Sequence, residues 1–277
     1  MKDYLAYEFD EGSKELISIQ DELPYWSAPF GIELLKSIKP GRGIKALDIG
    51  SGFGFPMIEI ANRLGNSGRI YGIDPWKPAV ERIKYKIEKL GITNAEIING
   101  YAEELPFEEG FFNLIVSNNG INNVLDMAKV FGECRRVSAK GAQFVFTLNL
   151  QDTMIEFYEV LRKVLEEMGL NKEVEKMKEH IYKKRRPVDE IEEALISAEF
   201  KQVKIRMSSF EYRFADAGAL FNYPMIKWWF LPAWKELIPG EYLEPVFEKL
   251  EEGLNRTALK QGEIKLTIPF ATFEAVK

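Results

Sequence analysis

The sequence Ala46-Leu-Asp-Ile-Gly-Ser-Gly-Phe-Gly-Phe55 joins an apolar run to three closely spaced glycines. This order is typical of a strand that leads through a tight loop into a helix. The glycines at 50, 52 and 54 let the backbone turn sharply and approach a ligand without a Cβ in the way. The helix behind the loop has free N–H groups at its start. We predict a ligand-binding strand–loop–helix unit, which several nucleotide-binding folds share.

The surrounding residues alternate between short apolar runs and helical patterns. Strands are predicted at 44–49, 69–73, 95–98, 112–117 and 142–148, and helices are clearest at 56–64, 77–90 and 124–137. Gly91 follows the second helix, as a C-terminal cap glycine does. Apolar strands that alternate with helices indicate a parallel sheet covered on both faces, so the predicted fold class is α/β.

The pattern changes after Leu150. Apolar residues at helical spacing predict an amphipathic helix over 152–168. A charged segment, 171–186, follows and ends at Pro187, and Asp189 is the predicted N-cap of a helix over 190–198. Two long strands are predicted at 200–214 and 262–276. The aromatic-rich stretch between them, 215–261, is interpreted as an insertion, because the last strand would otherwise be separated from the sheet.

These patterns predict four parts of the chain. They are an N-terminal helical segment that covers the site (1–43), a ligand-binding core (44–150), a helical insertion that forms a substrate cover (151–187), and a C-terminal part (188–277) that completes the sheet and contains the insertion 215–261.

The composition restricts the available chemistry. The chain has 277 residues with one cysteine, Cys134, and one histidine, His180. One cysteine cannot form an intramolecular disulfide, and a Cys/His zinc site needs about four ligands. A carboxylate-only metal site has no signature in this sequence, so no metal is predicted. Serine–histidine or cysteine–histidine catalysis would depend on His180 alone.

The charge and the apolar segments restrict partners and location. The net charge is −6, whereas domains that hold nucleic acid are usually basic, so nucleic acid is not expected as a partner. The N-terminus has no apolar core of a signal peptide. The stretch 223–234 is interrupted by Pro224, Lys227 and Pro232 and is shorter than the about 20 apolar residues of a membrane span. We expect a cytoplasmic protein, for which a homodimer is possible.

The spacing of the glycines separates two classes of cofactor. The dinucleotide fingerprint is G-x-G-x-x-G, but Phe55 occupies its last position and the pattern present is D-x-G-x-G-x-G. In this respect the sequence resembles the class I S-adenosylmethionine-dependent methyltransferases. The resemblance implies a Rossmann-like, seven-stranded, mostly parallel sheet with one antiparallel strand near the C-terminus. It also implies S-adenosyl-L-methionine as the cofactor.

The resemblance assigns cofactor contacts to several segments. The glycine loop (Asp48, Gly50, Ser51, Gly52 and Gly54) would lie beside the methionine part of the cofactor. Asp74, at the end of the second strand, would take the ribose hydroxyls, and Trp76 or Pro75 would pack on the adenine. Asp48 has a second interpretation, in which it only anchors the glycine turn. Trp76 has one too, as an ordinary packing residue.

Two residues depart from the family pattern, and one of them concerns the adenine. The stretch Asn99-Gly-Tyr-Ala-Glu-Glu-Leu-Pro-Phe107 resembles the family's G-D-A-x-x-L-P-F, with Tyr101 in place of the usual acid. Either Glu103 replaces that acid, or adenine is held by stacking and by the backbone at Ala102. Asn113 stands where the family often has Asp.

The turn after the fourth strand contains four asparagines. Ligands in open α/β sheets bind outside the carboxyl ends of strands, so Asn118 and Asn119 are candidates for the cofactor and Asn122 and Asn123 for the acceptor. Asparagine is also a common turn residue, and that interpretation stays open. N-terminal segments of this family often close over the cofactor, which makes Tyr25 and Trp26 further candidates for the substrate side.

The only imidazole lies in a basic segment. His180 precedes Lys183-Lys-Arg-Arg186, which is either a solvated surface or a clamp for an acidic acceptor formed by Arg185 and Arg186. In the second interpretation His180 is the catalytic base.

The resemblance is strongest to the small-molecule branch that includes ubiquinone and menaquinone biosynthesis enzymes. It implies methyl transfer to a small-molecule acceptor. The alternatives are a nicotinamide-dependent oxidoreductase, against which the glycine spacing argues, an aminopropyltransferase, and a non-catalytic S-adenosylmethionine-binding protein.

Overall fold

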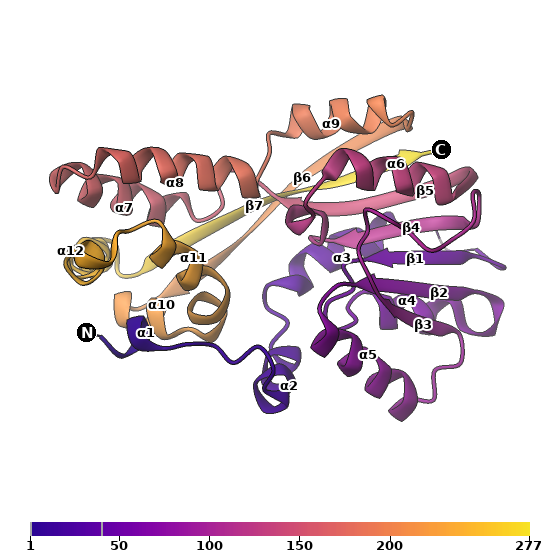
Figure 1. Ribbon diagram of the computed structural model, residues 1–277, viewed down its shortest axis with the longest axis horizontal. Coiled ribbons are helices and arrows are strands. Elements are labelled where there is room, and N and C mark those ends of the chain that lie inside the picture. Colours follow the sequence, from indigo (N-terminus) through magenta and orange to yellow (C-terminus); the bar gives the residue numbers. More distant parts are fainter. Residues whose placement is uncertain (1, 40) are drawn as a thin grey trace. The chain divides into compact units, whose positions relative to one another are not determined.

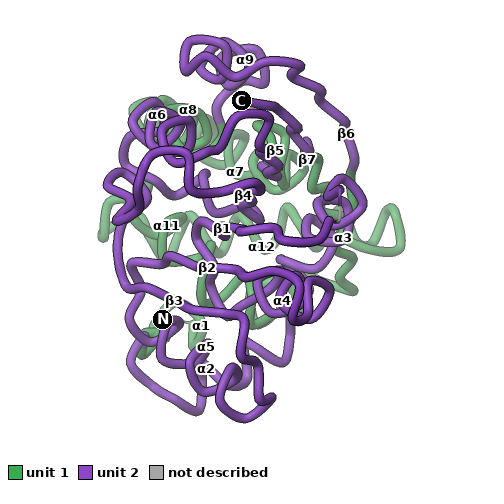
Figure 2. Tube along the Cα trace, turned by 90° about the vertical axis from the view of Figure 1, so that its right-hand side faces the viewer, with its two compact units in different colours: residues 1–10, 150–185, 209–269 green, residues 11–149, 186–208, 270–277 purple. Residues whose placement is uncertain are grey.

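The computed structural model describes residues 2–39 and 41–277, which form two compact units (Figure 2). Each unit is assembled from separate stretches of the chain. Unit 1 contains residues 2–10, 150–185 and 209–269, and unit 2 contains residues 11–149, 186–208 and 270–277. The glycine loop and its neighbouring strands therefore belong to unit 2.

Among the described residues, seven strands form one sheet in the order β3-β2-β1-β4-β5-β7-β6 (Figure 1). The strands are β1 (Lys45–Ile49), β2 (Arg69–Asp74), β3 (Ala95–Asn99), β4 (Phe112–Asn118), β5 (Ser138–Asn149), β6 (Lys201–Phe214) and β7 (Ile264–Val276). The pairs β1–β2, β1–β4, β2–β3 and β4–β5 are parallel, and β7 runs antiparallel to β5. The predicted sheet, including its antiparallel strand near the C-terminus, is confirmed.

The order of the strands reverses at β1. The chain proceeds outward from β1 through β2 to β3 and then returns to the other side of β1 with β4. The loops that follow β1 and β4 consequently leave neighbouring strands at the same edge of the sheet. In open α/β sheets this switch point is where ligands bind.

The helices of unit 2 cover both faces of its sheet. They are α2 (Lys14–Glu22), α3 (Ser27–Ser37), α4 (Met57–Leu64), α5 (Lys77–Lys89), α6 (Met127–Val137) and α9 (Val188–Ser197), with short 3₁₀ turns η1 (Gly65–Ser67) and η2 (Ile121–Asn123). Successive side chains of a strand point to opposite faces. In β5, Val145 belongs to the core shared with α3, α4 and α5, while Phe144 and Phe146 contact Phe131 of α6.

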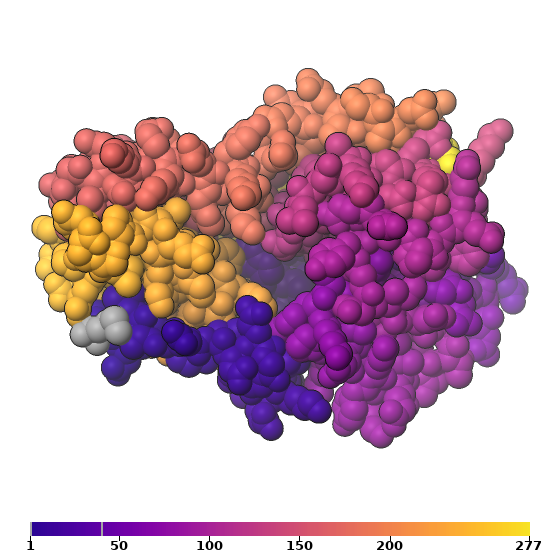
Figure 3. All heavy atoms as spheres, viewed as in Figure 1, coloured from indigo at the N-terminus to yellow at the C-terminus, as the bar shows by residue number. Residues whose placement is uncertain are grey.

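Unit 1 is mainly helical and has an aromatic core. Its helices are α1 (Asp3–Ala6), α7 (Ile155–Glu167), α8 (Asn171–Lys184), α10 (Ala217–Asn222), the π-helix η3 (Ile226–Phe230), α11 (Leu231–Glu236) and α12 (Gly240–Gln261). Trp234 stacks on Phe157 with 3.8 Å between ring centroids, and its indole N–H donates to the Tyr158 hydroxyl at 3.0 Å. The neighbouring helices α7 and α8 form a continuous surface in the space-filling view (Figure 3).

Two predictions about residues 171–198 need correction or refinement. Asp189 is not an N-cap, because α9 begins at Val188 after Pro187. Asp189 instead lies in the first turn, where the helix dipole favours an acidic side chain. The charged segment at 171–186 forms the helix α8 over most of its length.

Candidate functional site

The glycine loop requires glycine for two different reasons. Gly50, Gly52 and Gly54 have φ of 68°, 51° and 97°, in the left-handed region that other residues rarely adopt. A Cβ on Gly50 would also lie 3.0 Å from Cα of Gly120, so the loop packs closely on the turn after β4. A Cβ on Gly52 would project into open space, where a ligand can approach the backbone.

Asp74 holds this loop from the end of β2. Its Oδ2 accepts the Gly52 N–H at 2.8 Å and its Oδ1 accepts the Trp76 N–H at 2.9 Å. Burial raises the pKa of the Asp74 carboxyl, and these two backbone hydrogen bonds act in the opposite direction. Because a carboxylate oxygen can accept more than one hydrogen bond, Asp74 retains capacity for hydroxyl groups.

Asp48 is a buried acid without a countercharge. Neither carboxylate oxygen makes a hydrogen bond of good geometry within the described residues. Burial and then the negative charge of Asp74 raise the pKa of Asp48 to about 8, against weaker effects of Ser51 and the Met57 amide. Its neighbourhood is therefore electrostatically suited to a cation.

An aromatic pair stands beside the loop. The ring of Trp76, at the start of α5, meets the ring of Phe53 edge to face at 5.4 Å between centroids. Sequence reasoning identified Trp76 but missed Phe53. The available signal was a large aromatic residue between two glycines, at a position where small or polar residues would have sufficed for the turn.

The segment after β3 contains one exposed and one buried cofactor candidate side by side. Tyr101 is 62% exposed, whereas Ala102 is buried. The Glu103 carboxylate accepts the backbone N–H groups of Leu125 at 2.8 Å and Asp126 at 3.3 Å. Glu103 thus ties this segment to the turn that precedes α6.

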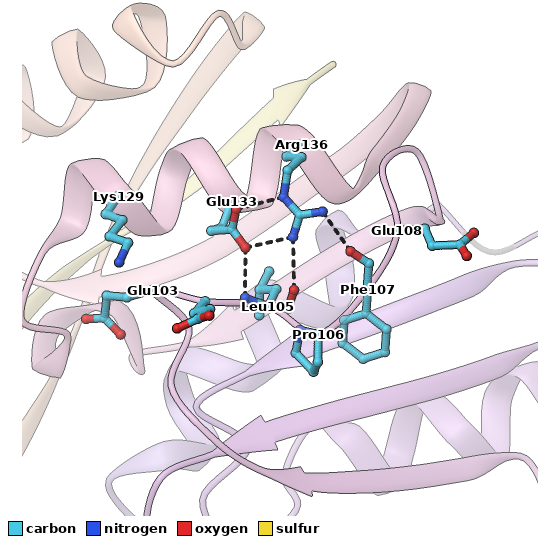
Figure 4. Close-up of a pocket in the computed structure, with 9 residues that line it drawn as sticks. Glu103, Leu105, Pro106, Phe107, Glu108, Lys129, Glu133 and Arg136 are labelled. Atoms are coloured by element: carbon cyan, nitrogen blue, oxygen red, sulfur yellow. Dashed lines mark hydrogen bonds and ion pairs between the residues drawn. The ribbon is translucent and has the colours of Figure 1, made fainter.

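Two side chains of α6 fix the rest of this segment (Figure 4). Arg136 donates to the backbone oxygens of Phe107 at 2.7 Å and Leu105 at 2.9 Å, and Glu133 accepts the Leu105 N–H at 2.8 Å. The hydrogen bond from Arg136, opposed by some burial, lowers the pKa of Glu133. Neither residue was identified from the sequence, because the contact joins a helix to backbone atoms 28 or more residues away.

The carboxyl ends of β4 and β5 carry a cluster of amides. The Asn119 side-chain oxygen accepts from Asn122 at 2.8 Å and from the Asn149 backbone N–H at 3.0 Å. Asn122 also donates to the Asn149 side chain. Asn118 accepts the Thr147 hydroxyl at 3.1 Å. Three of the four predicted asparagines are therefore brought together, and Asn149, which the sequence did not single out, belongs with them.

The fourth asparagine differs from the others. Asn123 is exposed and its backbone N–H closes the turn onto Gly120 at 3.0 Å. The turn interpretation thus describes Asn123 better than it describes Asn119 or Asn122.

The N-terminal candidates lie in unit 2 near the end of β4. The Asn118 side chain donates to the backbone oxygen of Ser27 at 3.0 Å, directly after Trp26. The Trp26 ring contacts Phe30 at 5.2 Å, and Tyr25 is 63% exposed. This hydrogen bond connects the start of α3 to the switch point of the sheet.

The basic-segment candidates divide between the units. His180 on α8 and Arg185, directly after α8, belong to unit 1, and Arg186 belongs to unit 2. Arg185 is buried, while Arg186 is exposed and lies 3.7 Å from the Glu190 carboxylate. Burial and then the charge of Arg185 lower the pKa of His180 to about 4. Its imidazole is therefore neutral at pH 7 and only weakly basic.

The geometry of unit 2 agrees with a comparison against known families. A family model described as a methyltransferase domain matches residues 40–212. The chain belongs to this methyltransferase-domain family. The match covers the glycine loop, β1 to β5 and most of β6.

Curated relatives of the methyltransferase share part of its length. Demethylmenaquinone methyltransferase of Bacillus mycoides is 34% identical over 123 residues, which are 44% of this chain and 51% of that protein. The enzyme of the same name from Bacillus cytotoxicus is 33% identical over 126 residues, 46% and 52% of the two chains. The chain thus spans about half the length of the curated relatives it matches.

Solved structures share the fold over most of the chain. The YcgJ protein from Bacillus subtilis superposes with a TM-score of 0.58 at 15% identity, over 90% of this chain and 98% of that one. A putative methyltransferase from Bacillus halodurans gives a TM-score of 0.57 at 18% identity, over 89% and 98%. The similarity to these two proteins is one of fold, which is Rossmann-like.

The residues at the switch point fit S-adenosylmethionine. The Asp48 carboxyl, buried without a well-formed hydrogen bond in the described part of the chain, suits a cationic amino group, and the open space over Gly52 admits close backbone approach. None of the described helices is both long and apolar enough to cross a bilayer. In the part of the chain that the structure describes, no three His, Cys, Asp or Glu side chains are grouped to hold a metal ion.

Proposed function

We propose that this protein is an S-adenosylmethionine-dependent methyltransferase that acts on a small-molecule acceptor. One observation carries the proposal: the glycine loop is held by Asp74 immediately beside the uncompensated carboxyl of Asp48. Two acids at a glycine loop favour a cationic cofactor over a pyrophosphate, because the charge of Asp74 repels an anion and a cation stabilises the ionised form of Asp48. Membership of the methyltransferase-domain family supports the same assignment.

Each cofactor contact has a physical basis. Asp74 accepts the ribose hydroxyls, Trp76 with Pro75 packs on the adenine, and Asp48 faces the amino group of the methionine part. The remaining proposed cofactor contacts are Gly50, Ser51, Gly52, Gly54, Tyr101, Ala102, Glu103, Asn118 and Asn119. Glu103 reaches the cofactor with the oxygen that does not accept from the backbone, because its other oxygen holds the turn before α6.

The cofactor supplies an activated methyl group on a sulfonium when it is bound. The protein then has to align the acceptor with that methyl group and exclude water. Alignment of this kind can lower the activation barrier by about 7–11 kcal/mol. Tyr25, Trp26, Asn122, Asn123, Arg185 and Arg186 are proposed to hold the acceptor. His180 is proposed to accept a proton where the acceptor must lose one, and its neutral form at pH 7 is the form that this role requires.

The net charge bears on the class of acceptor. The net charge of −6 favours a small molecule over nucleic acid as the acceptor. A cytoplasmic location and a homodimer complete the proposal.

Calorimetric titration with S-adenosylhomocysteine tests the cofactor site. Asp74→Ala removes the acceptor of the Gly52 N–H, and Gly52→Val fills the open space with a side chain in a left-handed conformation. We expect both variants to lose at least about 100-fold in affinity, which corresponds to about 2.7 kcal/mol.

Gly43→Val is the matched control. Gly43 also has positive φ and open space around its Cβ position, but it lies in the turn before β1 rather than after it. It introduces the same backbone strain as Gly52→Val without touching the loop. Wild-type affinity in a folded Gly52→Val variant would refute the assignment. Titration with NADH, and methyl transfer to a panel of metabolites, separate the oxidoreductase and the non-catalytic alternatives from the enzyme proposed here.

A further inference from the structure

Three asparagines at the ends of β4 and β5 form a closed hydrogen-bonded network. The Asn119 side-chain oxygen accepts the backbone N–H of Asn149 at 3.0 Å and the side-chain N–H of Asn122 at 2.8 Å. The same Asn122 nitrogen also donates to the side-chain oxygen of Asn149. All three residues belong to unit 2, so the network lies within one unit. Each asparagine is held by the other two.

One backbone group determines the direction of every bond in this network. A backbone N–H can only donate, so the atom of Asn119 that faces Asn149 must be the carbonyl oxygen. Asn122 must then meet that oxygen with its nitrogen, and Asn149 must meet the same nitrogen with its oxygen. A flipped amide at any of the three positions would place two donors or two acceptors face to face.

Two amide atoms of the network remain uncommitted. Asn119 Nδ2 and Asn122 Oδ1 make no hydrogen bond within the described part of the chain, and neither is among its fully covered polar atoms. Asn119 as a whole is only 9% exposed. A mostly buried amide with an unused donor lacks a partner that a ligand can supply. The network thus presents one donor and one neighbouring acceptor, each with a fixed direction.

The network lies directly beside the glycine loop. Gly120 follows Asn119, and its Cα lies 3.0 Å from the position that a Cβ on Gly50 would take. Asn119 has a φ of 59°, which residues other than glycine seldom adopt and which is concentrated at functional sites. Its backbone N–H donates to the Thr147 backbone oxygen at 3.0 Å, so this conformation is held in place.

We propose that Asn149 is a positioning residue, which orients the amides of Asn119 and Asn122 so that they bind a donor–acceptor pair on the methyl acceptor. The proposal rests on the proposed function, which it deepens by stating the polarity of the acceptor. The matching group carries a hydrogen-bond acceptor beside a donor, as a carboxamide does. A bare carboxylate at this position offers acceptors only and would face the lone pairs of Asn122 Oδ1. The Asn119 backbone is left for the cofactor contact proposed above.

The test uses the full chain saturated with S-adenosylhomocysteine, as wild type, Asn149→Leu, Asn149→Asp and Asn94→Leu. Asn149→Leu removes the oxygen that orients Asn122, whereas Asn149→Asp keeps an oxygen at that position. Asn94→Leu is the matched control, because Asn94 donates to the backbone oxygens of Ala61 and Gly65, at the amino ends of the strands. The probes are benzamide, which pairs a donor with an acceptor, and benzoate, which has nearly the same shape and offers acceptors only.

Probe titrations are followed in proton–nitrogen correlation spectra of the side-chain amide groups. Wild type, Asn149→Asp and Asn94→Leu should bind benzamide at least about tenfold more tightly than benzoate, because only benzamide satisfies both uncommitted atoms. Asn149→Leu should lose this preference, since the Asn122 amide can then turn. Asn122→Leu removes the uncommitted oxygen itself and should lose it as well, so the test does not depend on the folding of one variant.

A purely structural network predicts a different result, in which the leucine variants lose stability and none of them changes the preference. An equal benzamide preference in wild type and Asn149→Leu overturns the proposal. The absence of a benzamide preference in wild type also overturns it.

Binding of S-adenosylhomocysteine separates this proposal from the proposed function. Its affinity should be the same in wild type, Asn149→Leu and Asn94→Leu, because the side chains of the network hold the acceptor. Failure of all these proteins to bind it would refute the cofactor assignment, while the benzamide preference is still measurable without it. Among metabolites that wild type methylates, Asn149→Leu should raise KM at least about tenfold with a smaller change in kcat.

Discussion

Asp48 combines deep burial with the lack of a well-formed side-chain hydrogen bond within the described residues, an arrangement that is costly for a carboxylate. Burial and the charge of Asp74 keep it protonated over much of the physiological range, with its pKa raised to about 8. Such strongly perturbed groups concentrate at functional sites. A positively charged ligand group beside Asp48 would favour its ionised form. Ligand binding and proton release from Asp48 are therefore coupled, and the coupling can be measured.

The free energy of unfolding should fall as pH rises from 6.5 to 8. The pKa of Asp48 is above its unfolded value of about 3.9, so the native state binds more protons in this window and loses stability as they dissociate. The slope attributable to Asp48 is at most about 1.4 kcal/mol per pH unit. Asp48→Asn should abolish it in urea unfolding, and an identical slope in both proteins would contradict the assignment.

The comparison with Asp48→Asn separates the contribution of Asp48 from those of the other shifted groups, which both proteins share. The pKa of His180 is lowered to about 4, so its contribution makes stability rise with pH from about 4 through 6.5 and fades over about one pH unit above that. Burial raises the pKa of Cys134, whose contribution begins above about pH 8.5.

As a second measurement, cofactor binding to wild type at pH 7 should release up to about 0.9 proton, detected by calorimetry in buffers of different ionisation enthalpy.

At the scale of elements, α6 acts on the cofactor side through backbone atoms rather than through a ligand contact. Glu133 and Arg136 hold the segment that carries Ala102 and Glu103 by three hydrogen bonds. Hydrogen bonds that involve a charged group are worth about 1.5–3 kcal/mol each when broken, less where solvent reaches them.

Arg136→Met should lower the free energy of unfolding by about 1–3 kcal/mol and weaken S-adenosylhomocysteine binding several-fold, because the released segment loses its fixed position. Urea unfolding and calorimetry measure the two effects. Arg135→Met is the matched control. Arg135 lies on the same helix but makes a looser ion pair, with 3.7 Å between its guanidinium and the Glu199 carboxylate. Equal effects of the two variants on cofactor affinity would show that α6 does not position this segment.

Helix and strand positions followed the sequence pattern closely where burial is periodic. The strands 45–49, 69–74 and 95–99 agree with their predicted runs to within one residue. The largest differences are at ends, where hydrogen bonds to other parts of the chain determine the boundary. The strand β5 begins at Ser138 rather than 142, because Ser138 pairs with Phe112 of β4 across a register shift.

At the scale of the whole molecule, the division into two units places every proposed cofactor contact in unit 2. Most candidates for the acceptor lie there as well, and His180 with Arg185 lies in unit 1. The cofactor site should therefore form within a single unit.

Hydrogen exchange should reveal this division. Addition of S-adenosylhomocysteine should slow exchange of backbone amides in segments 50–54 and 74–77 by about tenfold or more, because ligand binding reduces local opening. The helix α12 of unit 1 serves as the internal control and should be unchanged. Protection that is confined to unit 1 would contradict the placement of the cofactor site.

The sequence by itself determined the α/β class, the glycine loop and the family, because glycine spacing and apolar periodicity are local properties. Only the tertiary structure decided which acids lack partners, which asparagines form a cluster and which arginine is buried. Arg185 and Arg186 are adjacent and chemically identical, yet one is covered and the other ion-paired at the surface. Burial depends on residues distant in sequence, so no local pattern could distinguish the two.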